Sequence, residues 1–347
     1  ILIPFISLSQ VINKSLYYDG LNREYIIYVP ANYDGSINVP LFFSFHGGSG
    51  YASDHMQMTN INTISDTAGF IAVYPQGALD INGAEPGNTP STSWLHKAPT
   101  THNDVNFISS IIDTLSNEYT IDLDRIYACG YSEGGIFSYE LACRLSNKIA
   151  AIGSVSGSML TESFRTDYGF GNCSPAHPTA IILIPGTNDG SYHSLYSGFQ
   201  PYYLSANEII NYWTSVNNTD LNPISSNVNN TNTNDGSTVE KYEWKNGDNC
   251  VSITELKVVG GGHDWPGSFG NMDINASGEI WKFVSRFNIN GMINCNTNQL
   301  QENIFTKKKE IIKTFDQLGR FIKKEQENHL YFYIYNDGSV EKRINLK

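Results

Sequence analysis

The sequence predicts an α/β fold: a mostly parallel sheet with helices on both faces, followed by a small C-terminal all-β unit. Two observations carry this prediction. Between about residues 20 and 288, short apolar runs alternate with segments of helical periodicity, which is typical of a sheet built from strand-helix-strand units. Beyond residue 303 the pattern changes to that of paired strands around a turn.

Composition excludes several classes of protein. The chain has 347 residues, of which 40% are hydrophobic and 16% charged, so it can form a sizeable core. A net charge of −12, from 22 Lys+Arg against 34 Asp+Glu, argues against nucleic acid or an anionic membrane as the main partner. No stretch approaches the roughly 18 consecutive apolar residues that span a bilayer.

The first nine residues are apolar and end at Ser7 to Ser9 in the small-x-small form of a signal-peptidase site. We interpret residues 1–9 as a signal-peptide remnant rather than a first core strand, since Pro4 lies in their middle. Export would permit disulfides. Cys129 falls in a buried-strand pattern and is expected to be unpaired. The other four cysteines could form two bridges of undetermined pairing: Cys143, Cys173, Cys250 and Cys295.

The elements of the body are expected in a definite order. Apolar strand patterns cover residues 24–30, 41–45, 70–75, 125–129, 149–155, 179–185 and 253–259. Helical spacing covers 104–119, a second helix begins near Ile136, and a closing helix lies around 279–287. Residues 217–237 form a polar, Asn-rich insertion that is expected to be a surface loop.

The end of the chain differs from the body. Residues 289–303 are polar and aperiodic, as expected of a linker between a domain of residues 10–288 and a unit of residues 304–347. Within that unit, 330–335 is a strand pattern, Asn336 to Gly338 a turn signal, and a returning strand begins at Val340.

This C-terminal unit resembles a known sorting signal. The segments Asp316 to Arg320 and Tyr335 to Arg343 look like the C-terminal sorting domain of the type nine secretion system of Bacteroidota. The resemblance implies a partnership with that secretion machinery and a secreted or cell-surface location. A carbohydrate-binding β-module is the alternative.

The sharpest motif follows the strand at 125–129. Gly130 to Gly134 (G-Y-S-E-G) fits G-x-S-x-G and leads into a helix. A strand-turn-helix of this kind exposes its serine on a strained turn, and glycines at 130 and 134 would let helix and strand approach closely. Ser132 is therefore the candidate nucleophile. A phosphate-binding turn is the alternative, but no Lys follows as in a P-loop.

A serine nucleophile of this type needs an acid and then a histidine further along the chain. His263 lies in a glycine-rich loop after the last body strand, and Asp189 follows the strand at 179–185. We expect Asp189 to orient the imidazole of His263, which would act as the base. Less suitable candidates are His177, His193, His329, Asp167, Asp220, Asp235 and Asp248. Asp264 is interpreted as a surface or supporting carboxylate.

Acyl transfer also needs N–H donors directed at the developing oxyanion. The backbone N–H of Glu133 is one candidate, because it follows the nucleophile. Gly47 and Gly48, after the strand at 41–45, are the others, and glycine lets the main chain approach a substrate. His46 is expected to fix this loop by hydrogen bonding rather than to act as a base.

These motifs, in this order, resemble those of one group of secreted α/β-hydrolases: the poly(3-hydroxybutyrate) depolymerases, feruloyl esterases and acetylxylan esterases. The matching segments are 46–50, 70–77, 104–108, 130–135, 186–189 and 260–267. The resemblance implies an α/β-hydrolase fold, an acyl-enzyme on Ser132, and ester hydrolysis without metal or cofactor. Glu133 departs from the smaller or neutral residues usual in this elbow, which would disfavour anionic substrates.

The resemblance also implies a polymer-linked ester as substrate. Feruloylated or acetylated xylan is the first choice and polyhydroxybutyrate the second, because the remaining length shows no polyester-binding domain. Trp94 and Trp265 are candidates for lining the substrate pocket, with core packing as the alternative. Two alternative hypotheses come from other functional classes: a serine peptidase and a non-catalytic glycan-binding surface protein.

Overall fold

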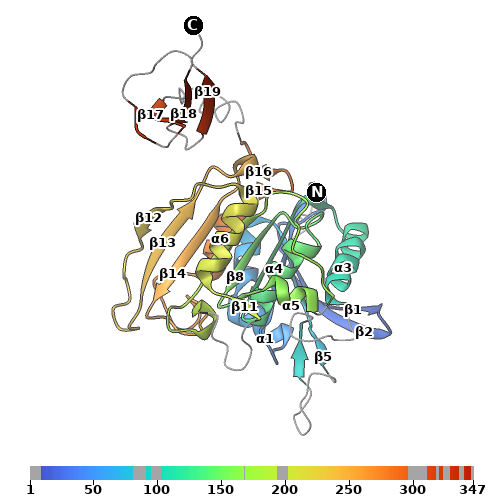
Figure 1. Cartoon of the computed structure of the whole chain (residues 1–347). Coiled ribbons are helices and arrows are strands. Elements are labelled where there is room, and N and C mark those ends of the chain that lie inside the picture. The colour runs from blue at the N-terminus through green and yellow to red at the C-terminus, as the bar shows by residue number, and fades with distance from the viewer. Residues whose placement is uncertain are drawn as a thin grey trace, which may run out of the picture. The chain divides into compact units, whose positions relative to one another are not determined.

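The structure, a computed structural model, describes residues 9–80, 91–94, 103–167, 169–193, 202–295, 311–317, 320–322, 329–335 and 340–344. The chain divides into two compact units, residues 1–295 and 296–347, and each is described by itself (Figure 1). The expected signal-peptide remnant falls almost wholly outside the described residues, which begin with Ser9.

A ten-stranded sheet forms the centre of the first unit, in the order β1-β2-β4-β3-β7-β8-β10-β14-β13-β12. Its middle strands are parallel: β4 (Ile71–Pro75), β3 (Val39–Phe45), β7 (Ile121–Tyr131), β8 (Ala151–Val155), β10 (Ala180–Ile184) and β14 (Ile253–Val259). Antiparallel pairs extend both edges: β1 (Gln10–Tyr18) with β2 (Leu21–Val29), and β13 (Thr238–Trp244) with β12 (Ile224–Asn227). The predicted mostly parallel sheet is confirmed.

Helices cover both faces of this sheet because its central strands are apolar on both sides. Leu41, Phe43 and Phe45 of β3 belong to one buried cluster, and Phe42 belongs to the other. The first cluster contains side chains of α3 (Asp104–Glu118), α4 (Glu133–Arg144) and α6 (Ala206–Asn217), which lie in front of the sheet in Figure 1. The second contains side chains of α1 (Ala52–Thr59), α2 (Ile61–Ala68) and α7 (Ala276–Val284).

The Asn-rich insertion is only partly a loop. Its residues 224–227 form the edge strand β12, which pairs with β13, so the insertion extends the sheet. Several short elements complete the first unit: β5 (Ala78–Asp80), β6 (Ser91–Ser93), β9 (Met159–Leu160), α5 (Glu162–Asp167), η1 (Gly190–His193), β11 (Tyr203–Leu204), η2 (Asp248–Cys250), β15 (Phe287–Asn288) and β16 (Gly291–Met292).

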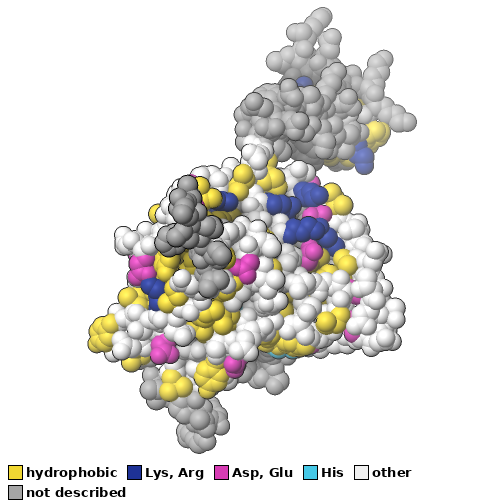
Figure 2. Space-filling model, turned by 180° about the vertical axis from the view of Figure 1, so that it is seen from behind, with side chains coloured by type: hydrophobic (Ala, Val, Ile, Leu, Met, Phe, Trp, Pro, Cys, Tyr) yellow, Lys and Arg dark blue, Asp and Glu magenta, His cyan; other side chains and the backbone are white. Residues whose placement is uncertain are grey.

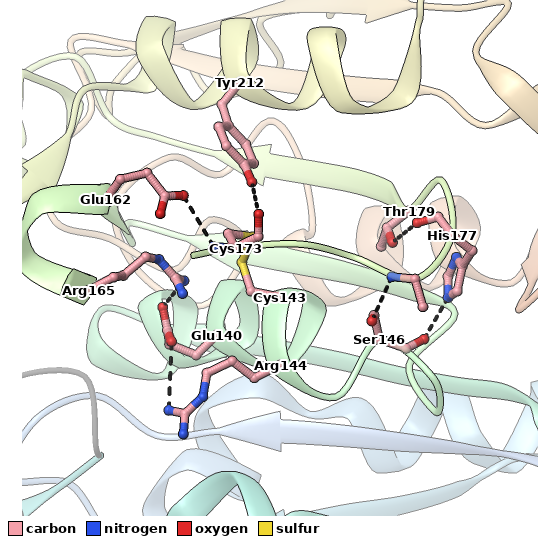
Figure 3. The surroundings of a disulfide bond; sticks show 11 residues. Glu140, Cys143, Arg144, Ser146, Glu162, Arg165, Cys173, His177, Thr179 and Tyr212 are labelled. Atoms are coloured by element: carbon pink, nitrogen blue, oxygen red, sulfur yellow. Dashed lines mark hydrogen bonds and ion pairs between the residues drawn. A yellow bond between two sulfur atoms is a disulfide. The ribbon is translucent and has the colours of Figure 1, made fainter. Parts of the chain in front are cut away.

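One disulfide fastens the segment around α5 to the helix that follows the elbow. Cys143 of α4 is bonded to Cys173, and the carbonyl of Cys173 accepts a hydrogen bond from Tyr212 at 2.8 Å (Figure 3). Beside this disulfide, the fully buried Arg165 forms an ion pair with the buried Glu140. A covalent bond and a buried ion pair therefore hold the same segment against α4.

A second disulfide lies at the C-terminal end of the first unit. It joins Cys250 to Cys295, and Ile289 N–H donates to Asp124 O at 2.9 Å. The first unit thus extends through residues 289–295, which were expected to belong to a linker. The rest of the expected linker, residues 296–303, lies outside the described residues. Cys129 is buried and unpaired, as expected.

The second unit contains a three-stranded antiparallel sheet, β17 (Ile311–Asp316), β18 (Leu330–Tyr335) and β19 (Val340–Ile344). Alternate tyrosines of β18 are buried together: Tyr331, Tyr333 and Tyr335. The all-β prediction is confirmed, with one strand, β17, that the pattern did not indicate. The expected turn at 336–338 lies outside the described residues.

The surface is sparsely charged. Figure 2 shows a face of the molecule on which uncharged polar side chains and backbone predominate, with few charged side chains among them. Among the described residues, the structure has no helix with the length and apolarity needed to cross a membrane.

Candidate active site

Ser132 stands on a sharp turn between β7 and α4, with φ 54° and ψ −117°. The turn is tight because two glycines allow it. A Cβ on Gly130 would lie 2.2 Å from the carbonyl carbon of Gly134, and a Cβ on Gly134 would lie 2.2 Å from Phe45 O. Ser132 N–H donates to Val155 O at 2.9 Å, which fixes the turn to β8. The local geometry is that of a nucleophile elbow.

Asp189 and His263 are brought together by neighbouring strands. They follow β10 and β14, which are adjacent and parallel, so their loops leave the same edge of the sheet. His263 Nδ1 and Asp189 Oδ2 are 2.8 Å apart. The two loops are joined by backbone hydrogen bonds, including Asn188 N–H to Gly261 O at 2.8 Å. The pair is thus held by the backbone as well as by its own side chains.

The environment of Asp189 favours its ionised form. The residue is 5% exposed, and burial alone would raise the pKa of its carboxyl group. Hydrogen bonds from His263 and from Ser191, whose hydroxyl donates at 2.5 Å, outweigh burial and lower that pKa. An ionised Asp189 accepts the Nδ1 proton of His263 and leaves Nε2 as the nitrogen that can act as a base.

Tyr131, the residue before Ser132, contacts His263 directly. Its hydroxyl donates to the carbonyl of His263 at 2.7 Å, and the two ring centroids are 5.1 Å apart. Burial raises the pKa of Tyr131 to about 12, so the hydroxyl remains a donor. Sequence reasoning missed this residue, because it occupies a variable position of the G-x-S-x-G motif.

Asp264 supports the same loop. Its carboxylate accepts the N–H of Gly262 at 2.9 Å, and its carbonyl accepts the hydroxyl of Ser156 at 3.0 Å. These contacts fix the main chain on both sides of His263. They agree with the interpretation of Asp264 as a supporting carboxylate.

The loop after β3 lies against the elbow. A Cβ on Gly47 would lie 3.2 Å from Ser132 Cβ, and one on Gly48 would lie 2.3 Å from a carboxylate oxygen of Glu133. Within the described part of the chain, the N–H groups of Gly47 and Gly48 donate to no other residue. Two backbone donors and the elbow are therefore close together.

His46 fixes this loop through both ring nitrogens. Gly77 N–H donates to Nε2 at 2.9 Å, and Nδ1 lies 2.7 Å from Gly47 O. Nε2 is thus an acceptor, and Nδ1 carries the proton that is donated to Gly47 O. Burial lowers the pKa of His46, which keeps it neutral. The expected loop-fixing role agrees with these contacts.

Glu133 turns its side chain away from solvent. The residue is 4% exposed, and its carboxylate accepts the hydroxyl of Ser93 at 3.2 Å. The carboxyl group lies beside Gly48, in the loop that carries the candidate oxyanion donors.

The structure places both candidate substrate tryptophans in the interior. Trp94 is 0% exposed, stacks on Phe137 and donates to His46 O at 2.9 Å. Trp265 is 1% exposed and donates to Ser277 Oγ at 3.1 Å. Neither ring offers a face to a substrate, so the prediction of a pocket-lining role is corrected to the packing alternative. Both rings can be buried without losing a hydrogen bond, because each indole N–H donates to an acceptor inside the protein.

Behind the site lies a third histidine. His55 is buried, its Nε2 is 2.8 Å from Ser44 Oγ, and its ring meets Trp265 edge-on. Burial lowers its pKa to about 3. Among the described residues there is no group of three or more His, Cys, Asp or Glu side chains that could hold a metal ion.

Part of the sequence and the fold of the first unit resemble those of known proteins. Residues 23–171 match the family model described as Esterase PHB depolymerase. Among solved structures, an acetyl xylan esterase from Aspergillus awamori is similar in fold, with a TM-score of 0.55 and 16% sequence identity. The alignment covers 79% of this chain and 98% of that esterase. The first unit has the α/β-hydrolase fold. The fold predicted from the motifs is thereby confirmed.

Sequence relatives are esterases. A bifunctional acetylxylan esterase/xylanase from Neocallimastix patriciarum is 29% identical over 83% of this chain and 37% of its own length. Feruloyl esterase B from Piromyces equi is 26% identical over 77% of this chain and 46% of its own. The chain spans less than half the length of these curated relatives. The likenesses support the esterase resemblance drawn from the motifs.

Proposed function

We propose that the protein is a serine carboxylic-ester hydrolase. The observation that carries this proposal is the 2.8 Å contact between His263 and Asp189 at the sheet edge where Ser132 occupies a strained turn. This combination supplies a nucleophile, a base and an orienting acid in the chain order of an α/β-hydrolase. The esterase relatives support it.

In the proposed mechanism, Ser132 Oγ attacks the acyl carbonyl while His263 Nε2 accepts its proton. Asp189 stabilises the imidazolium that forms. The oxyanion is bound by the N–H of Glu133 and by N–H groups of Gly47 and Gly48. His263 then gives the proton to the leaving alcohol, and water hydrolyses the acyl-Ser132 intermediate through the same base.

For the substrate we propose feruloyl or acetyl esters on plant xylan. The acetylxylan and feruloyl esterase relatives support this choice, and an acidic, sparsely charged surface suits a neutral polysaccharide. Polyhydroxybutyrate is the second candidate, favoured by the description of the matching family model.

We also propose that the protein is exported, with residues 304–347 as a sorting domain for type nine secretion. Two disulfides in the first unit support an oxidising compartment. The three-stranded sheet around β18 is compatible with the sorting unit expected from the sequence.

Replacement of the nucleophile tests the esterase proposal. Ser132→Ala in the full chain should lower kcat/KM for p-nitrophenyl acetate by roughly 10⁶-fold without changing the melting temperature by more than a few degrees. Ser225→Ala, on the exposed edge strand β12, is the matched control and should retain full activity. Equal hydrolysis by parent and Ser132→Ala would refute the nucleophile assignment.

A panel of methyl ferulate, acetylated xylan and polyhydroxybutyrate would then rank the substrates. We expect the parent to hydrolyse the first or second and to leave the polyester intact. Hydrolysis of polyhydroxybutyrate alone would replace the xylan proposal with the second candidate.

A further inference from the structure

A groove of about 430 Å³ lies between the β1–β2 ribbon and the start of α1, and none of its lining residues has a role in the proposed chemistry. Its floor is the β1–β2 ribbon, where Asn13 is paired with Ile26 and Ser15 with Glu24, so these side chains share one face. Its wall is the segment Tyr51 to Ser53 at the start of α1.

The groove opens at the same edge of the sheet as Ser132. Tyr25 pairs with Pro75, the last residue of β4, and Gln76 N–H donates to Glu24 O at 2.9 Å. The strand order β2-β4-β3-β7 places β2 three strand spacings from β7, which is roughly 14 Å at about 4.8 Å per spacing. A polymer with its ester at Ser132 would need only this span to reach the groove.

The loop that carries the candidate oxyanion donors joins the two places. Gly47 lies against Ser132, and Tyr51 follows the same loop at the wall of the groove. Gln76 lines the groove and ties the loop down: its side chain accepts Ala52 N–H at 2.9 Å and donates to Gly50 O at 3.2 Å. Gln76 therefore contacts both the groove and the loop, whereas no hydrogen bond joins the side chain of Tyr51 to the described residues of that loop.

The chemistry of the lining fits an uncharged, hydroxyl-rich chain. Tyr51 is 59% exposed, so its ring offers a flat apolar face. Within the described residues, the side chains of Asn13, Ser15, Glu24 and Tyr51 have no hydrogen-bond partner, which leaves donors and acceptors for sugar hydroxyls. The cation of Lys14 is already paired with Glu118. An anionic ligand would meet Glu24, and an apolar polyester would leave these polar groups unpaired.

We propose that this groove binds sugar units of the polysaccharide that carries the ester, with Tyr51 as the stacking platform and Asn13, Ser15 and Glu24 as hydrogen-bonding partners. This inference rests on the proposed esterase function and adds to it a position for the main chain of the substrate. Tyr51 touches the substrate but not the reacting atoms, so its loss weakens polymer binding and leaves the chemistry on small esters intact.

The test compares Tyr51→Ala with Tyr17→Ala in the full chain. Tyr17 is the matched control, because it is a 74% exposed tyrosine on the same β1–β2 ribbon that does not line the groove. Tyr51→Ala should lower kcat/KM for acetylated xylan roughly tenfold, through KM, and change kcat/KM for p-nitrophenyl acetate less than twofold. Tyr51→Phe should restore most of the loss, because it keeps the ring.

Binding is measured independently of hydrolysis by electrophoresis of the full chain through a gel containing de-esterified xylan. The parent and Tyr17→Ala should be retarded, and Tyr51→Ala should migrate as in a gel without xylan. No retardation of the parent, equal loss with Tyr17→Ala, or a Tyr51→Ala defect on polyhydroxybutyrate but not on xylan would overturn the groove assignment. Failure of the parent to hydrolyse any ester would instead refute the esterase function.

Discussion

Two histidine loops flank Ser132, and they are built in opposite ways. His46 is 2% exposed and uses both ring nitrogens on backbone groups of Gly47 and Gly77. The side chain of His263 is 37% exposed and uses Nδ1 on a carboxylate. A histidine with both nitrogens committed to the backbone fixes a loop, whereas one oriented through Nδ1 keeps Nε2 for proton transfer. Proximity to a nucleophile does not distinguish them; the partner of Nδ1 does, which is a backbone carbonyl for His46 and a carboxylate for His263.

Replacement of each histidine gives the largest expected contrast. His263→Ala should lower kcat for p-nitrophenyl acetate by about 10⁶-fold, because no other base is oriented by Asp189. His46→Ala should cost no more than the roughly 10²- to 10³-fold of losing one oxyanion donor, since it disturbs only the loop. Steady-state kinetics on purified full-length variants measures both. Similar losses for the two variants would contradict the division of roles.

The two carboxylates near His263 allow a second contrast. Asp189→Asn should lower kcat by about 10⁴-fold with the fold intact, because the amide would favour the wrong tautomer of the imidazole. Asp264→Asn, in which only a hydrogen bond from Gly262 N–H is altered, should lower kcat less than tenfold. A larger effect at Asp264 than at Asp189 would reverse the assignment of the acid.

The smallest expected effect is the one of buried His55 on the pH dependence of stability. Burial lowers the pKa of His55 to about 3, so below pH 6.5 the unfolded chain takes up a proton that the folded chain does not. The contribution of neutral His55 to the free energy of unfolding is therefore complete above pH 6.5 and is lost as the pH falls towards 3. Between pH 6.5 and 5.0 this amounts to about 2 kcal/mol of unfolding free energy.

Urea unfolding at the two pH values measures this effect in the parent and in His55→Gln. The variant has no titrating group at this position, so its stability should fall by about 2 kcal/mol less than that of the parent over the same interval. The control is His193→Gln, at an exposed histidine on η1, which should keep the parental pH dependence. An unchanged slope in His55→Gln would show that His55 is protonated in the folded protein.

The sequence predicted those features whose signals are local. The seven predicted body strands were recognisable as short apolar runs, which is typical of buried parallel strands such as six of them, and Ser132, Asp189 and His263 each follow one of the seven. Three strands of the central sheet were missed, β1, β12 and β13, and all belong to the antiparallel pairs that extend its two edges. In β1 and β12 polar and apolar residues are mixed, because one face is exposed, and the pairing partner decides their structure.

Other misses have different causes. Helix α6 has a complete capping box between Ser205 and Glu208, a signal that could have located it. The burial of Trp94 could not be read from sequence, because its neighbours Phe45, His46 and Phe137 come from distant segments. The groove at Tyr51 was also invisible, since it needs β1, β2 and the start of α1 together.

The bond between Cys250 and Cys295 has a consequence for how this chain could be processed. Cys295 is the last residue of the first unit, and it is covalently joined to a loop next to β14, the strand that precedes His263. Proteolysis directly after Cys295 would release the second unit and leave a new chain end that the cross-link holds in place. The first unit could thus lose the second without loosening the strand that leads to the candidate base.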